Sequence, residues 1–355
     1  MEMTTSNSIQ KNGKEIFPYP PSFIDRFMQF IQQLPVPYWL MYFVLFILQV
    51  LIHHIVDWVD GSLPVYTFRS LILFYPLWIW SPLIIMTYLD SIALEALSTF
   101  YPLLDIPADT IGRLKYEFTT MPARSVIISA SIWTGIYAIF TYSIYVPVYM
   151  VLRLGSLGLV YNILEGWACF LMGGILLYHT IRQLRLVHRT VKLVKQFDLF
   201  QLDPVYAFSV LTSRTGVVSI LLPSLTFLIV PFQLSPVPII VLLIQGIMVA
   251  LAVFALPLWV VHQRLVTEKR KLLAEHGQRV KSTLAQLYRS MDDNKLGDVA
   301  QLNSVITTLN AGRSILEEIP TWPWRAGLFT GFLSAIVLPI ILLLAQIAIR
   351  KWLNV

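Results

Sequence analysis

Charged residues are scarce in this sequence. Only 13% of the 355 residues are Asp, Glu, Lys or Arg, whereas 56% are hydrophobic. Ordinary soluble domains contain roughly twice this charged fraction. Because such a chain cannot cover its apolar surface with polar groups, we expect its surroundings to be largely lipid. The prediction is an all-α, polytopic transmembrane helical bundle in the cell membrane, with membrane lipids as neighbours.

Cysteine is almost absent, since Cys169 is the single one. This excludes an intramolecular disulfide and any metal site built from several cysteines. The sequence also lacks a Gly-rich phosphate loop, a His-Glu-x-x-His motif and a nucleophile elbow. We therefore expect no cofactor and no metal, and we lean towards a non-enzymatic protein. Basic loops facing an anionic inner leaflet explain the net charge of +6, so we expect no nucleic-acid partner.

Long apolar runs are abundant, and about 20 such residues suffice for a helix to cross the hydrocarbon core. We predict seven spans, at about 38–56, 68–89, 126–152, 157–179, 217–231, 237–261 and 326–349. Lys and Arg favour the cytoplasmic side. With the N-terminus inside, 22 of the 26 fall on that side. The predicted orientation therefore has the N-terminus cytoplasmic and the C-terminus outside, with Arg350 and Lys351 as the one discordant feature.

This pattern divides the chain into four parts. They are a cytoplasmic N-terminal segment (1–36), a six-span bundle (37–262) with a cytoplasmic helix extension at 180–215, a cytoplasmic helical hairpin (263–320), and an interfacial segment with the seventh span (321–355). Both arms of the hairpin carry apolar residues at three- and four-residue spacing, around the turn "DDNKLGD" (292–298). Such stripes favour helix–helix association, within one chain or between copies. A homo-oligomer is therefore one expected partner.

The stretch "LFILQVLIHHIVDWVDGSLP" (45–64) leads from an apolar run into two histidines and two aspartates. His53, Asp57 and Asp60 fall on one side of a helix, with His54 beside them. Imidazole and carboxylate at this spacing can hold zinc or relay protons, but no further ligand is evident on another outer segment. A metal site, a pH-sensitive or ligand-lining site and a helix end with satisfied polar groups are the alternatives. We favour the helix end.

Glu165 is an acid inside the fourth predicted span, and Asn162 lies three residues before it. Ionisable groups in a span are costly and face a cavity or a partner. Gly166, Gly173 and Gly174 allow another helix to approach closely. We favour a carboxyl group that is protonated or hydrogen-bonded between helices. A water-filled cavity or conduction path is the alternative.

A third polar group occurs in "DLFQLDPVYAFSVLTSRTG" (198–216), at the predicted inner surface. Its members are Asp198, Asp203, Ser209 and Arg214. Together they could build a site, but they also suit helix ends. In particular, Asp203 before Pro204 is typical of an N-cap followed by proline at the first helical position, and we favour this interpretation.

The hairpin ends at "EEIPTWPWRAG" (317–327). Trp322 and Trp324 are aromatic residues of the kind that gather at membrane interfaces, and Arg325 can reach phosphate groups while its stem stays in lipid. We favour an interfacial anchor. A hinge that couples the hairpin to the seventh span is the alternative.

The stretches "RLKYEFTTMPARS" (113–125), "DLFQLDPVYAFSVLTSRTG" (198–216) and "LEEIPTWPWRAG" (316–327) together resemble a family of bacterial multi-pass membrane proteins without assigned activity. This resemblance implies a membrane protein and adds no chemistry. The topology is also similar to that of the insect odorant and gustatory receptors, which are tetrameric ligand-gated cation channels with a cytoplasmic helical anchor. The last span has Gln346 but lacks the Thr-Tyr pair that precedes the glutamine in that family.

The expected function is that of a sensor, channel or scaffold assembled through its cytoplasmic helices, with an unidentified small-molecule ligand. The alternative is a membrane-embedded enzyme or transporter that acts on a lipid-like substrate at the inner leaflet through the 198–214 residues.

Overall fold

The computed structural model describes residues 18–141, 155–194, 197–229, 236–293 and 296–353. Within these ranges the chain forms ten α-helices and no strand, with 83% helix. The all-α prediction is confirmed.

The helices follow one another along the chain with two short 3₁₀ turns. They are α1 (Phe23–Gln32), α2 (Tyr38–Val59), η1 (Ser70–Leu73), α3 (Phe74–Phe100), η2 (Tyr101–Leu103), α4 (Ala108–Thr119), α5 (Ala123–Phe140), α7 (Ser156–Lys192), α8 (Ala207–Ile229), α9 (Pro236–Asp292), α10 (Leu296–Glu318) and α11 (Ala326–Leu353). Five segments of the described chain are long and apolar enough to cross a membrane. They are Tyr38–Val59, Ser70–Leu103, Ser156–Lys192, Ala207–Thr226 and Ile244–Asp292.

The other two predicted spans correspond to α5 and α11. Their described apolar stretches, Ala123–Ile139 and Gly327–Leu342, are shorter, and the second half of the predicted span at 126–152 lies outside the described residues. The predicted turn between the fifth and sixth spans also falls mostly outside them.

The helix of the fifth predicted span begins earlier than residue 217, because α8 starts at Ala207. The sequence there is rich in serine and threonine. In the structure their hydroxyl groups donate to carbonyl groups one turn earlier in the same helix, as Thr215 does to Leu211 and Ser219 to Thr215, both at 2.8 Å. These bonds satisfy the hydroxyls, so the helix continues through them. The predicted N-cap at Asp203 is wrong, because residues 203–206 form a turn and α8 begins only at Ala207.

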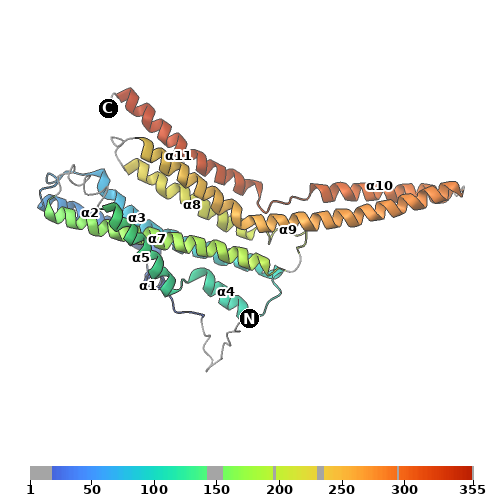
Figure 1. Ribbon diagram of the computed structural model, residues 1–355, viewed down its shortest axis with the longest axis horizontal. Helices are drawn as coiled ribbons and strands as arrows, with labels where there is room; N and C mark the ends of the chain where they lie inside the picture. The colour runs from blue at the N-terminus through green and yellow to red at the C-terminus, as the bar shows by residue number, and fades with distance from the viewer. Residues whose placement is uncertain (1–17, 142–154, 195–196, 230–235, 294–295, 354–355) are drawn as a thin grey trace, which may run out of the picture.

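α3 occupies the centre of the bundle. It packs against α2 and α7 on one side and against α8 on the other, while α5 packs on α7, and α9 and α11 pack on α8. Figure 1 shows α11 along the top of the bundle and the α9–α10 hairpin projecting from one end. The largest apolar core lies at this end, where Phe100, Phe118 and Phe208 are almost fully buried.

The predicted extension at 180–215 is only partly helical. α7 continues without interruption to Lys192, and Val187, Val191 and Val194 are buried in the core instead of facing a membrane surface. The chain then loops and turns until α8 begins. Arg264 of α9 holds the end of α7 by donating to the Val194 carbonyl at 2.6 Å.

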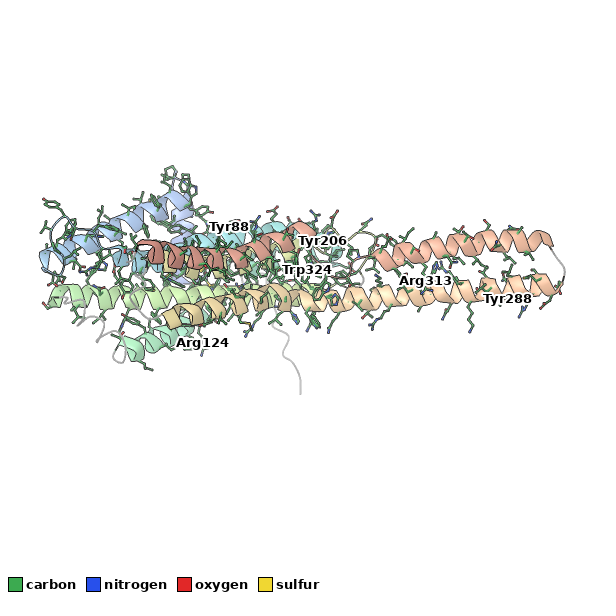
Figure 2. All side chains as sticks on the ribbon, turned by 90° about the horizontal axis from the view of Figure 1, so that it is seen from above. Tyr88, Arg124, Tyr206, Tyr288, Arg313 and Trp324 are labelled. Atoms are coloured by element: carbon green, nitrogen blue, oxygen red, sulfur yellow. The ribbon has the colours of Figure 1, made fainter. Side chains whose placement is uncertain are left out.

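The predicted hairpin is formed by α9 and α10, which pack against each other. Figure 2 shows Tyr288 and Arg313 on its two arms, far from the bundle. Lys269 of α9 donates to the carbonyls of Glu317 and Ile319 at the end of α10, at 2.6 and 2.8 Å. Between residues 266 and 318, no described side chain is buried.

α2 has its polar side chains inside and its apolar side chains outside. His53, His54 and Asp57 are 1%, 4% and 1% exposed, whereas Leu51 and Ile55 are each 52% exposed. In α7, Glu165 and Asn162 are likewise buried while apolar neighbours are exposed. This is the reverse of a helix on a water-soluble protein, and it is the arrangement expected where the surroundings are apolar.

Candidate functional site: a buried histidine–carboxylate cluster

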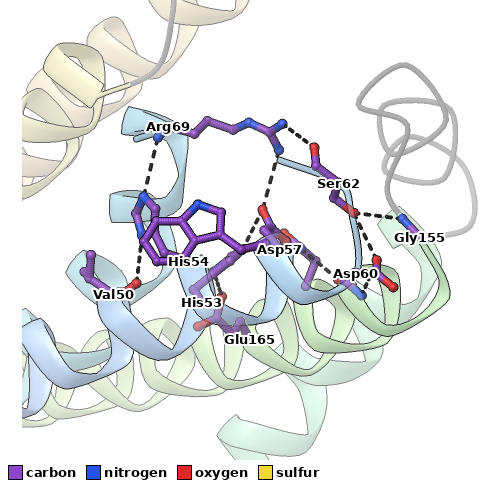
Figure 3. Close-up of polar contacts among 12 residues, drawn as sticks. Val50, His53, His54, Asp57, Asp60, Ser62, Arg69, Gly155 and Glu165 are labelled. Atoms are coloured by element: carbon purple, nitrogen blue, oxygen red, sulfur yellow. Dashed lines mark hydrogen bonds and ion pairs between the residues drawn. The ribbon is translucent and has the colours of Figure 1, made fainter. Parts of the chain in front are cut away.

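The polar residues of α2 and α7 meet in one buried group. The second half of α2 faces the first half of α7, and the chain after α2 folds back over both, so that residues far apart in sequence converge (Figure 3). We call this group the His53 cluster. Its members are Gln49, His53, Asp57, Arg69, Asn162 and Glu165.

His53 lies at the centre of the cluster. Its Nδ1 is 2.6 Å from Glu165 Oε2, and the two side chains are only 2% and 5% exposed. The pair is not aligned as a full hydrogen bond, but atoms this close cannot both present lone pairs, so one of them carries a proton. On the other side of the ring, Nε2 is 3.4 Å from Asn162 Nδ2 and 3.9 Å from Asp57 Oδ2.

The second oxygen of Glu165 is tied into a chain of hydrogen bonds across three helices. Gln49 Nε2 donates to Glu165 Oε1 at 2.7 Å. Trp80 Nε1 of α3 donates to Gln49 Oε1 at 2.6 Å. The amide of Gln49 therefore links α3, α2 and α7.

Asp57 is 1% exposed, and no described group is placed to form a hydrogen bond with either of its oxygens. Its charged neighbours are Arg69 Nη1 at 3.6 Å and the His53 ring. Arg69 Nη2 also donates to the Ser62 carbonyl at 3.0 Å. Asp57 is therefore held mainly by charge. It lies in the last turn of α2, as expected, but its carboxylate is buried there and is not satisfied by hydrogen bonds.

His54 has a structural role in this arrangement. Its Nδ1 donates to the Val50 carbonyl at 2.8 Å, and its Nε2 accepts from the Arg69 backbone amide at 3.4 Å. Both ring nitrogens are thus occupied by backbone groups, which fixes the chain that returns Arg69 to the cluster.

Asp60 anchors the start of α7. Its carboxylate accepts from the backbone amides of Leu157 and Gly158 at 3.2 and 3.0 Å and from Ser62 Oγ at 2.9 Å. The hydrogen bond from Gly158 is the largest cause that lowers the pKa of Asp60. A Cβ atom at Gly155 would lie 2.3 Å from Asp60 Oδ2, so a larger residue there would displace the Asp60 carboxylate from its hydrogen bonds. Asp60 therefore agrees with the helix-end interpretation, but the amides that it satisfies are those at the start of α7.

The charges of the His53 cluster do not balance when His53 is neutral. Asp57 and Glu165 are two carboxylates, and Arg69 supplies one fixed positive charge. Protonation of His53 or of a carboxyl group would bring the formal charge to zero. Buried charge that lacks a partner is costly, and the cluster has one carboxylate more than its fixed cation compensates. Among the described residues, no group of three or more His, Cys, Asp or Glu side chains could hold a metal ion.

A second buried group, the Asp90 cluster, lies farther along α7. His179 Nε2 and Gln183 Nε2 are each 2.9 Å from Asp90 Oδ1 of α3. Asp25 of α1 lies near it and accepts from the backbone amides of Ser22 and Met121, both at 2.9 Å. Burial is the largest cause that raises the pKa of Asp25; its hydrogen bonds and the charge of His179 act in the opposite direction.

The two clusters lie on one side of α7. Glu165 and His179 are 14 residues apart, which corresponds to about 21 Å along the helix axis and nearly the same face. Between them the buried residues of α7 include Cys169, Met172 and Ile175. An apolar layer therefore separates two histidine–carboxylate pairs.

The glycines of α7 differ in their surroundings. A Cβ atom at Gly166 would lie 1.9 Å from Tyr137 Oη, and one at Gly174 would lie 2.5 Å from Trp133 Cδ1, whereas Gly173 has nothing within 4 Å. The expected close approach of another helix is thus found at Gly166 and Gly174, where the helix is α5.

The inner-surface residues predicted as a group have separate partners. Asp198 accepts from the Phe200 amide at 2.8 Å, Ser209 Oγ donates to the Tyr206 carbonyl at 2.6 Å, and Arg214 is exposed. Asp203 binds Arg325 Nη2 through Oδ1 at 2.5 Å.

The Trp-Pro-Trp segment forms part of an aromatic stack. The ring centroids of His262 and Trp322 are 4.0 Å apart, and those of Trp322 and Trp324 are 4.4 Å apart. Trp324 then stacks on Phe254 at 5.0 Å, and Phe254 on Phe332 at 4.3 Å. The stack ties the segment to both α9 and α11.

Sequence reasoning missed Gln49, Arg69, Asp90 and Asp25 as members of buried polar groups. Gln49 had a usable signal, since it interrupts an apolar run four residues before His53. Asp90 directly follows the predicted span at 68–89, and Arg69 is one of the four basic residues that the predicted orientation leaves off the cytoplasmic side. Its ion pair with Asp57 gives a physical reason for its position.

Comparison with known proteins adds no family to this picture. No family model matches the chain, and no curated protein or solved structure is significantly similar to it.

Proposed function

We propose that this chain is a multi-pass protein of the cell membrane that acts as a sensor or channel rather than as an enzyme, and that it responds to protonation of the His53 cluster. The contact of 2.6 Å between buried His53 Nδ1 and Glu165 Oε2 carries the proposal. Histidine is the side chain that changes charge between about pH 5 and pH 8. Buried polar groups in a span usually serve a pathway or a switch.

Seven spans, a cytoplasmic N-terminus and an outer C-terminus form the topology of this proposal. The inverted burial pattern of α2 and α7 supports lipid surroundings. α5 and α11 would be the two further spans, in addition to the five long apolar segments. The distribution of Lys and Arg supports the orientation.

Protonation would act on the contact between α2 and α7. Neutral His53 with its proton at Nδ1 accepts at Nε2 from Asn162 of α7. When Nε2 gains a proton it can no longer accept, and it is attracted instead to Asp57 of its own helix. The other titratable or charged groups in and around the cluster are His54 on α2, Asp60 and Arg69 after it, and Tyr161, Glu165 and Cys169 on α7. Proton binding thus weakens one link between the two helices.

Assembly through the α9–α10 hairpin is also part of the proposal. In a hairpin of only two helices, the apolar stripe of each helix is only partly covered by the other. Accordingly, no described side chain at 266–318 is buried. A second copy would cover these stripes. The resemblance to bacterial multi-pass proteins and to the insect receptors stays a prediction.

The test uses the full chain reconstituted in nanodiscs and in liposomes. Its mass in nanodiscs is measured first, and a single chain would contradict assembly. Infrared difference spectra between about pH 8 and pH 5 then report protonation of buried groups, and proton flux into liposomes separates a channel from a sensor. We expect a titration in the wild type that is lost in Glu165→Gln and in His53→Gln.

Glu318→Gln is the matched control, because Glu318 is an exposed acid at the end of α10. It should titrate as the wild type does. If the same titration persists in Glu165→Gln and in His53→Gln, the His53 cluster is not the responsive element.

A further inference from the structure

A groove opens at the opposite end of the bundle from the His53 cluster. It has a volume of about 470 Å³ and lies between the second half of α3, the start of α8 and the start of α11. α3 and α11 both flank α8, so α8 forms the floor of the groove. Figure 2 shows Tyr206 and Trp324 close to this place, where the bundle meets the hairpin.

The lining of the groove is amphipathic. Its apolar part includes Ile92, Ala96, Val210 and Leu328, and its polar part includes Glu95, Thr99 and Arg325. Glu95, Thr99 and Arg325 are exposed, whereas Ala96 is buried. A ligand that fits both parts has a polar head and an apolar chain.

The polar rim carries one guanidinium, from Arg325, and two carboxylates, from Asp203 and Glu95. Arg325 Nη2 donates to Asp203 Oδ1 at 2.5 Å, and its guanidinium lies 5.9 Å from the centre of the Tyr206 ring. Since a guanidinium has five N–H donors, several remain for a phosphate group. Arg325 also directly precedes the N-terminus of α11, whose positive dipole end favours an anion. Within the described chain Glu95 forms no ion pair, so its carboxylate is open to a cation.

We propose that this groove binds a phospholipid with a zwitterionic headgroup that ends in a primary ammonium, as in phosphatidylethanolamine. The phosphate contacts Arg325, the ammonium contacts Glu95 and Thr99, and one acyl chain lies along Ile92, Val210 and Leu328. Two carboxylates against one guanidinium make the rim negative, which disfavours a purely anionic headgroup.

The same rim selects against choline. A primary ammonium can donate hydrogen bonds to Glu95 and to the Thr99 hydroxyl, whereas a quaternary ammonium has no donor and prefers an aromatic cage. Tyr206 is the one aromatic side chain among the groove residues, and Arg325 already lies over its ring.

The proposal is tested by native mass spectrometry of the purified, delipidated full chain. Phosphatidylethanolamine, phosphatidylcholine and phosphatidylglycerol with identical acyl chains are titrated separately. We expect phosphatidylethanolamine to bind about tenfold more tightly than the other two, as for a charge-assisted hydrogen bond. Glycerophosphoethanolamine, which has the same head and no acyl chains, should bind far more weakly.

Two exposed-residue variants separate the contacts. Glu95→Gln should remove the preference over phosphatidylcholine, and Arg325→Gln should weaken all three lipids. Glu318→Gln should change nothing, and thermal unfolding should be the same for all variants. Equal binding of the three lipids, a preference for phosphatidylglycerol, an unchanged preference in Glu95→Gln, or equal binding of the soluble head alone would each overturn the proposal. None of these outcomes depends on the His53 cluster.

Discussion

Replacing Arg69 by glutamine should destabilise the protein strongly, because it leaves the buried Asp57 carboxylate without its guanidinium partner. The two charged groups are 3.6 Å apart, and their side chains are 24% and 1% exposed. At this separation Coulomb's law gives an attraction of about 5 kcal/mol for an effective dielectric constant of about 20. Breaking one side of a buried pair typically costs about 3 to 5 kcal/mol. We therefore expect Arg69→Gln to lower the free energy of unfolding by about 3 kcal/mol or more.

A double-mutant cycle isolates this pair from the other contacts of Arg69. Arg69→Gln also loses the hydrogen bond to the Ser62 carbonyl, worth about 1 kcal/mol, but this loss is common to the single and the double variant. Removing the second charge with Asp57→Asn should relieve the uncompensated carboxylate. The expected coupling energy is about 2 kcal/mol, within the usual range for residues in contact.

The assay is reversible unfolding in mixed micelles with increasing denaturing detergent, followed by circular dichroism. Arg124→Gln is the control, since Arg124 is exposed at the start of α5. Strictly additive losses in the double variant would refute the reasoning, because they would mean that Arg69 and Asp57 do not stabilise each other.

Two further predictions concern how α7 is held. Gly166→Ala should lower the free energy of unfolding by about 1 to 3 kcal/mol, because its Cβ atom would overlap the fully buried Tyr137. Gly173→Ala is the control and should leave the free energy of unfolding unchanged, because Gly173 has nothing within 4 Å. Equal effects of the two variants in the same unfolding assay would contradict the packing at Gly166. For Asp60, the folded-state pKa is lowered, so the unfolded chain binds the proton first. Its contribution to stability is present above about pH 3.9 and is lost as the pH falls through the lower folded-state pKa. Asp60→Asn should therefore flatten the dependence of unfolding on pH below about pH 5, and an unchanged slope would exclude this role.

The helical class and the position of most helices could be predicted from the sequence because they depend on local properties. Apolar runs of sufficient length mark α2, α3, α7 and α9, and the three- and four-residue spacing marks both arms of the hairpin. Where local pattern and structure diverged, as at the start of α8, the sequence showed polar residues and the fold satisfied them within the helix.

The candidate site could be predicted only in pieces. His53 and Glu165 each stood out, since an ionisable residue beside or within an apolar run is costly in lipid. They were assigned to separate groups, because 112 positions separate them along the chain and nothing in the local pattern relates one helix face to another.

The sequence by itself therefore determined that the chain is helical and apolar, and which side chains are costly to bury. The tertiary structure decided which of them meet. The packing of α2 against α7 and the return of the chain to Arg69 bring four ionisable groups together, and the separate packing of α3 and α11 on α8 forms the groove at the other end. The physical reason is that burial and charge pairing depend on contacts between helices, whereas helix formation depends on residues within one helix.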